Sequence, residues 1–199
     1  MAAMYIANVG GMTSMVSFPA MVALFQSTWT LNNTELGWIS GVYFAGYVIA
    51  VPLLTGLTDR IDSRKILMVS LALGMFATAG FALSASGLWS ATFWRLLQGA
   101  GFAGIYMPSI KALSDALPDA KRSRGAAVLT SSYAMGASVS FFLTGMLGAA
   151  FDWRIAFLIL AAGPLIGWAL IAFFLPPNPP PGHGALSFRL DFRAVFRNK

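Results

Sequence analysis

Six apolar runs, each about as long as a membrane-spanning helix, constrain most strongly what this chain can fold into. A bilayer core about 30 Å thick is crossed by about 20 helical residues. Because lipid offers no hydrogen bonds, each run must satisfy its own backbone as a helix. The sequence therefore predicts an all-α membrane protein with six transmembrane helices. The runs are residues 4–26, 36–57, 66–86, 88–111, 125–149 and 155–175.

Composition agrees with a lipid environment and excludes several kinds of site. Hydrophobic residues make up 57% of the chain and charged residues 10%, whereas soluble domains carry about 25% charged residues. Cysteine is absent and the one histidine is His183, among prolines. We therefore predict no disulfide and no metal site. The first run has no basic residues before it, so we interpret it as a retained helix and not as a cleaved signal peptide.

The basic residues fall in alternate connections, which predicts an orientation. Lys and Arg prefer the cytoplasmic side of a membrane. Among the opposite connections only 151–154 holds a basic residue, Arg154. We predict a multi-pass protein of the cell's inner (plasma) membrane with both termini cytoplasmic. The net charge of +6 then reflects topology and not a nucleic-acid partner. The basic residues on the predicted cytoplasmic side are Arg60, Arg64, Lys65, Lys111, Lys121, Arg122, Arg124, Arg189, Arg193, Arg197 and Lys199.

Residues 176–199 differ in character from the apolar region 1–175. The segment "PPNPPPGHG" (176–184) predicts a stiff cytoplasmic linker. Beyond it, apolar residues recur at helical spacing beside a row of arginines. We predict an amphipathic basic helix on the anionic inner leaflet, with a disordered basic tail as the alternative. The apolar positions are Phe188, Phe192, Val195 and Phe196.

The charged connection between the second and third runs resembles a known loop motif. Asp59-Arg60 is followed at a short distance by Arg64-Lys65. This order is similar to the cytoplasmic loop motif of the major facilitator superfamily of transporters, although Thr55 and Asp62 stand where that motif has glycine. The resemblance implies that the loop is a conformational latch, packed against the other half of the molecule.

A second resemblance lies in the fourth run and the connection after it. Arg95-x-x-Gln98-Gly99-x-Gly101 is similar to the same superfamily's fourth-helix motif, and "SDALPDAKRSRG" resembles its next loop. By this resemblance Asp115 pairs with basic residues of the 59–65 loop, Arg64 first among them. Residues 1–175 would then be the N-terminal six-helix half of a 12-helix transporter, built of two inverted three-helix repeats. The resemblance implies alternating access and an ion gradient, most often of protons, with no cofactor.

Arg95 is the leading candidate for a substrate cavity. An arginine at the centre of a span costs about 2.5–3.5 kcal/mol on insertion scales, so it usually has a role. At 100° per residue Arg95 shares a polar and aromatic face with Gln98, Phe102, Tyr106 and Ser109. Two roles stay open, binding of an anionic group or modulation of proton coupling; the alternative is an arginine that snorkels to the surface. The further cavity candidates are Asn8, Tyr43, Tyr47, Ser131 and Ser138.

Small residues recur every four positions in the fifth run. Gly136, Ser140, Thr144 and Gly148 form one such row. A ridge of small residues lets helices approach closely in lipid. We therefore predict helix packing for this row.

Enzyme chemistry is not indicated. The chain has no phosphate-binding Gly-x-x-x-x-Gly-Lys-Ser/Thr loop, no Ser–His or Cys–His pair, and no acidic residue in mid-span.

We predict transport of a small organic molecule, with a second six-helix half in the same or another chain, since the sequence stops where a linker to that half would begin. The alternative is a truncated or half-size membrane subunit that does not transport.

Overall fold

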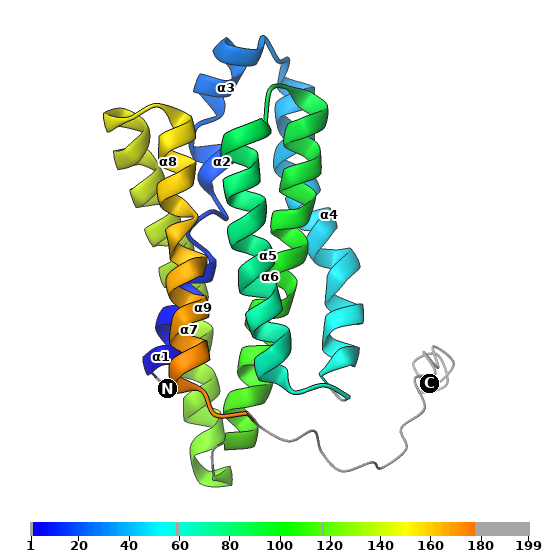
Figure 1. The fold of residues 1–199 in the computed structure, drawn as a ribbon, viewed down its shortest axis with the longest axis vertical. Helices are drawn as coiled ribbons and strands as arrows, with labels where there is room; N and C mark the ends of the chain where they lie inside the picture. The colour runs from blue at the N-terminus through cyan, green and yellow to red at the C-terminus, as the bar shows by residue number, and fades with distance from the viewer. Residues whose placement is uncertain (1, 59, 117, 178–199) are drawn as a thin grey trace, which may run out of the picture.

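A computed structural model describes residues 2–58, 60–116 and 118–177, which form an elongated bundle of α-helices (Figure 1). No strand occurs in these ranges, so the predicted all-α class is confirmed. The predicted linker and basic helix lie almost wholly outside them. The helices are α1 (Ala2–Gly11), α2 (Ser17–Ala20), α3 (Val22–Trp29), α4 (Asn33–Leu57), α5 (Ser63–Ser84), α6 (Leu88–Ala116), α7 (Asp119–Ala150), α8 (Trp153–Leu160) and α9 (Ala162–Phe174).

The structure does not confirm the count of six membrane-spanning helices. By length and hydropathy, four helices of the described chain could cross a membrane: 33–57, 63–84, 120–150 and 153–174. The first predicted run is divided among α1, α2 and α3. The helix α6 has 29 residues but carries Arg95, Gln98 and Lys111 among its apolar positions.

The same local cap starts two helices at opposite ends of the bundle. Asp62 Oδ1 accepts the backbone N–H of Arg64 at 2.9 Å at the start of α5. Asp152 Oδ1 accepts the N–H of Arg154 at 2.8 Å at the start of α8. Each carboxylate satisfies a backbone donor that has no partner within its helix. The two helices begin at opposite ends of the bundle (Figure 1).

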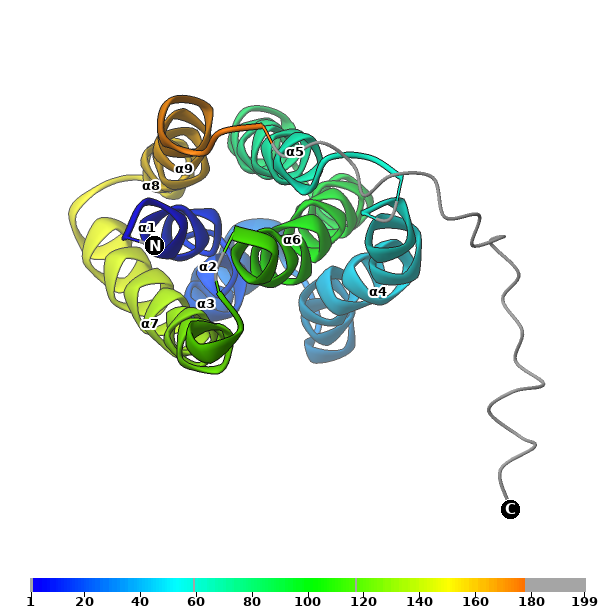
Figure 2. The ribbon, with the colours of Figure 1, turned by 90° about the horizontal axis from the view of Figure 1, so that it is seen from below.

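The helix α6 lies centrally and contacts α4, α5, α7 and α1 (Figure 2). Glycines bring α6 and α4 into backbone contact. A methyl group on Gly99 would overlap the carbonyl oxygen of Tyr43, and one on Gly46 would overlap the carbonyl of Leu96. Without a hydrophobic effect between helices in lipid, such close packing is a main source of association.

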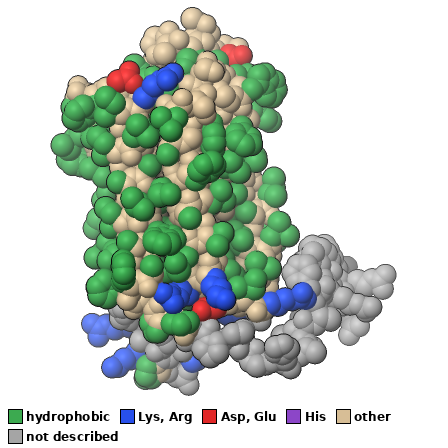
Figure 3. Space-filling view, in the orientation of Figure 1, with side chains coloured by type: hydrophobic (Ala, Val, Ile, Leu, Met, Phe, Trp, Pro, Cys, Tyr) green, Lys and Arg blue, Asp and Glu red, His purple; other side chains and the backbone are tan. Residues whose placement is uncertain are grey.

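The outer surface is apolar over most of the length of the bundle. Large side chains such as Val48, Leu83 and Phe173 are exposed. In the face drawn in Figure 3, hydrophobic side chains cover the middle, while most Lys and Arg side chains gather at the lower end. A broad apolar belt is stable against lipid and not against water. The protein is therefore a multi-pass membrane protein.

Candidate functional site

The first predicted span is interrupted between α1 and α2, well inside the bundle (Figure 1). Two local features favour the interruption. Thr13 Oγ1 lies 2.9 Å from the carbonyl of Gly10, a bond that competes with helical pairing. Pro19 has no N–H to offer the carbonyl of Met15, four residues earlier. Backbone carbonyls are thus left in the interior, where they need donors from other helices.

Arg95 of α6 is the donor to the carbonyl of Met15, and it shares the carbonyl of Ser14 with the Ser17 hydroxyl, which donates to it at 2.7 Å. Its Nη1 donates to the carbonyl of Ser14 at 3.3 Å and its Nη2 to that of Met15 at 3.1 Å. Gln98 Oε1 accepts a further bond from Nη1 at 2.8 Å. The guanidinium carbon lies 4.6 Å from the ring centroid of Tyr43. Arg95 is only 1% exposed, so its charge is held by carbonyl dipoles and an aromatic face.

Ser140 of α7 binds the same interruption from another side. Its hydroxyl donates to the carbonyl of Thr13 at 2.7 Å and accepts the N–H of Val16 at 3.0 Å. Thr13 Oγ1 also lies 2.9 Å from the carbonyl of Leu160 at the end of α8. The interruption is therefore a fixed junction that joins the first span to α6, α7 and α8.

Next to this junction four rings from three helices meet, and we call them the aromatic face: Tyr47 of α4, Phe102 and Tyr106 of α6, and Tyr133 of α7. The centroid of Phe102 lies 5.3 Å from that of Tyr47 and 6.2 Å from that of Tyr133. Tyr106 and Tyr133 are also 6.2 Å apart. The Tyr106 hydroxyl donates to Thr130 Oγ1 at 3.2 Å, which links α6 to α7.

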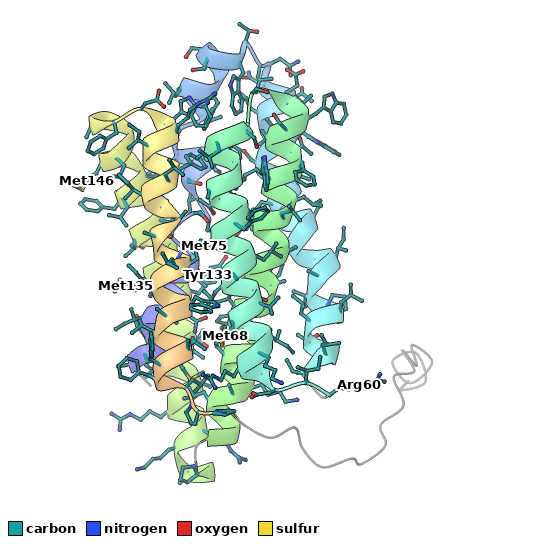
Figure 4. The ribbon with its side chains drawn as sticks, viewed as in Figure 1. Arg60, Met68, Met75, Tyr133, Met135 and Met146 are labelled. Carbon is teal, nitrogen blue, oxygen red and sulfur yellow. The ribbon has the colours of Figure 1, made fainter. Side chains whose placement is uncertain are left out.

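The aromatic face is partly open. Tyr133 is 40% exposed, Tyr47 and Tyr106 are half-buried, and Phe102 is buried beneath them. Figure 4 shows Tyr133 at mid-height on the inner side of α7, whereas Met135 and Met146 lie on its outer side. This arrangement can stack a planar group and can hydrogen-bond through hydroxyls, but it presents no charge.

The structure divides the predicted cavity residues into three groups by exposure. Tyr47 and Tyr106 belong to the aromatic face. Ser131 and Ser138 are exposed on α7, and the Ser131 hydroxyl bonds the carbonyl of Val128. The remaining candidates are buried, and they are Asn8, Tyr43, Arg95, Gln98 and Ser109.

Basic residues at one end of the bundle bind the carbonyl ends of neighbouring helices. Arg64 Nη2 donates to the carbonyl of Ala172 in the last turn of α9 at 2.6 Å. Lys111 Nζ donates to the carbonyl of Thr58 at the end of α4 at 2.8 Å. Both bonds place a cation where the helix dipole is negative. Of the other predicted latch residues, Arg60 and Lys65 are exposed, and Asp59 and the Asp115 side chain lie outside the described part of the chain.

The predicted ridge on α7 lies against the first span. A methyl group on Gly136 would approach Met12 Sδ to 2.6 Å, and one on Gly148 would approach Met21 Cε to 2.5 Å. Ser140 and Thr144, between them, are fully buried.

The sequence of the chain matches one family over nearly its whole length. Residues 3–199 match the family described as the Major Facilitator Superfamily. The chain belongs to this superfamily. The resemblance predicted from the two motifs is thereby confirmed.

Several known members of the superfamily are similar to this chain. The 4-hydroxybenzoate transporter PcaK of Acinetobacter baylyi is 31% identical over 154 residues, which cover 75% of this chain and 33% of that protein. The hexuronate transporter of Bacillus subtilis is 27% identical over 155 residues, 78% of this chain and 36% of that protein. A crystal structure of the peptide transporter POT has a TM-score of 0.75 at 16% identity, over 85% of this chain and 36% of that chain. This chain spans about a third of the length of these relatives.

Sequence reasoning missed three contributors to this superfamily member's site: the carbonyls of Ser14 and Met15, and the ring of Tyr133. Every residue has a backbone carbonyl, so no residue type in the sequence points to those of Ser14 and Met15. Tyr133 could have been found, because it is the one tyrosine of the fifth run and shares a helical face with Thr130.

Proposed function

We propose that this chain is the N-terminal half of a secondary transporter that moves a small organic molecule by alternating access. Similar members of the superfamily are named as transporters of 4-hydroxybenzoate, hexuronate, gentisate and benzoate. The observation that carries the proposal is the aromatic face. It gathers rings from three helices near the middle of their length, the depth at which transporter halves hold substrate.

A second six-helix half, in the same or another chain, supplies the opposing wall. A groove on α4 supports this part of the proposal; it is lined by Thr34, Gly37, Trp38, Gly41, Val42 and Ala45. A methyl group on Gly37 or Gly41 would meet no atom within 4 Å. The groove is therefore open to a further helix, and its small residues suit close packing in lipid.

The proposal also covers the orientation of the protein, its energy source and the roles of individual residues. The protein lies in the inner membrane of the cell, with both termini in the cytoplasm. The basic end of the bundle supports this orientation, since Lys and Arg prefer the cytoplasmic side of a membrane. A proton gradient drives transport. The 59–65 loop with Asp115 acts as the latch between conformations, and the row from Gly136 to Gly148 packs α7 on the first span. Arg95 and Gln98 hold the junction in the first span and thereby the shape of the wall.

Reconstitution of the full-length protein in liposomes tests this proposal. An acid-outside pH gradient should drive uptake of at least one solute from a panel of small organic acids above the passive uptake of protein-free liposomes, and a protonophore should abolish that excess. Asp59→Asn should slow uptake without changing the amount inserted. Uptake that is unchanged by the protonophore would refute proton coupling and leave the rest of the proposal standing. No uptake of any solute by correctly folded protein would favour a subunit that does not transport.

A further inference from the structure

We infer that the aromatic face binds the ring of an aromatic carboxylate, and that the counter-charge for the carboxylate comes from outside this half. The inference rests on the proposed transport function and deepens it, because it assigns one part of the substrate to named residues of this chain.

The rings of the aromatic face already pair with one another in the geometries that aromatic rings favour. Tyr47 is tilted 30° from Phe102, and Tyr133 is tilted 46° from the same ring. Tyr106 and Tyr133 stand nearly edge to face, at 70°. Aromatic pairs favour offset and edge-to-face arrangements with centroids 4.5–7 Å apart. An added aromatic ring can thus extend the cluster from its open side, whereas a saturated ring would gain only burial of apolar area.

Hydroxyl groups on the open side add selectivity for ring substituents. Tyr106 Oη and Thr130 Oγ1 are 3.2 Å apart, and the bond between them is exposed. Either oxygen can exchange this bond for one to a ring hydroxyl. Tyr133 brings a further hydroxyl from α7, beside Tyr106.

No accessible cation lies at this level of the described helices. Arg95 is the one charged side chain near their middle, and it is buried. Both of its Nη atoms are engaged by the carbonyls of Ser14 and Met15 and by Gln98. Turning Arg95 toward a ligand would strand the carbonyl of Met15 in the interior, which costs free energy. The carbonyl of Ser14 would keep its bond from the Ser17 hydroxyl at 2.7 Å. A carboxylate therefore finds no counter-charge here, so its partner must lie on the opposing wall.

Matched solutes test the inference on the full-length protein in liposomes. Benzoate and cyclohexanecarboxylate share a carboxylate and a six-membered ring but differ in aromaticity. Wild-type uptake above that of protein-free liposomes should favour benzoate. Tyr133→Leu should lower that preference by roughly 3- to 10-fold, the range that an aromatic pair contributes, while Tyr133→Phe keeps it. Phe142→Leu is the control, because Phe142 is exposed and half a helical turn around α7 from Tyr133.

Each outcome separates the inference from the proposed function. Preference for benzoate that falls in Tyr133→Leu and persists in Tyr133→Phe supports the inference. Equal uptake of both solutes, or uptake of glucuronate in preference to benzoate, overturns it and leaves transport standing. A preference that Tyr133→Leu does not alter also overturns it. If correctly folded wild-type protein takes up none of the three solutes, the proposed function fails for organic acids, and the inference fails with it.

Discussion

Arg95 Nη2 donates a hydrogen bond to the carbonyl of Met15 at 3.1 Å, across 80 positions of sequence. The bond joins α6 to the interrupted first span at a point where Pro19 leaves that carbonyl without a helical donor. An arginine within a span is costly unless its charge and donors are satisfied. Here Nη2 of Arg95 finds an acceptor and the carbonyl of Met15 finds a donor, so one bond lowers the cost of burying both groups.

Replacing Arg95 should destabilise the fold. In Arg95→Leu the carbonyls of Ser14 and Met15 lose a charged donor, and we expect the free energy of unfolding to fall by about 2–4 kcal/mol. Arg95→Lys should lie between Arg95→Leu and wild type, since one ammonium cannot reproduce the planar fork. Thermal unfolding in detergent, followed by tryptophan fluorescence, measures the effect. Arg124→Leu, at an exposed site, is the control, and equal melting of the two leucine variants would contradict the prediction.

Ser140→Ala should loosen the junction. The change removes the acceptor of the Val16 N–H and the donor to the Thr13 carbonyl, and each unsatisfied buried group costs about 1–3 kcal/mol. Hydrogen exchange of peptides that cover residues 12–20 should become faster. Ser138→Ala, two positions earlier and exposed, should leave their exchange unchanged. Unchanged exchange in Ser140→Ala would show that the hydroxyl is dispensable.

Gly99→Ala should force α6 away from α4. The new methyl group would meet the backbone carbonyl of Tyr43, which cannot move aside as a side chain can. We expect a loss of about 2–3 kcal/mol in the free energy of unfolding, at the upper end for overpacking. In Gly145→Ala the methyl group meets nothing within 4 Å, so this variant should melt like wild type. Similar melting of both variants would argue against backbone contact between α4 and α6.

Arg64→Ala should fray the end of α9. The carbonyl of Ala172 loses a charged donor in the last turn, and we expect a loss of roughly 1–2 kcal/mol because the site is partly exposed. Hydrogen exchange should accelerate in residues 171–177 and not in α8. Lys65→Ala provides the matched control at the exposed neighbouring position. The same exchange pattern in both variants would exclude a capping role for Arg64.

Residues 1–199 contain no cysteine, so a thiol introduced into them is the one thiol of this half, and it allows a direct test of orientation. Lys121→Cys and Ala150→Cys place single thiols at exposed sites near opposite ends of α7. An impermeant maleimide added to intact cells should label Ala150→Cys, and Lys121→Cys only after permeabilisation. The reverse pattern would invert the proposed orientation, and labelling of both from one side would mean that α7 does not cross the membrane.

The helical class, the membrane location and the superfamily could be predicted from the sequence. Lipid provides no hydrogen bonds, so an apolar run must be helical whatever surrounds it. Counting 100° per residue also placed Arg95, Phe102 and Tyr106 on one side of the fourth run. These predictions depend on neighbours in sequence, and for that reason they needed no knowledge of packing.

The tertiary structure decided what those side chains do. The partners of Arg95 are carbonyls 80 and 81 positions away. They lie at an interruption of the first span, and hydropathy alone predicts one continuous helix there. The same packing buries Arg95 and Gln98 and leaves Tyr133 half open beside Phe102. Burial and hydrogen bonding between distant segments depend on how close the helices approach, and that distance is set by glycine contacts such as Gly99 against Tyr43. Local sequence pattern can mark a glycine as a position for close packing, but it does not name the distant segment that the glycine meets.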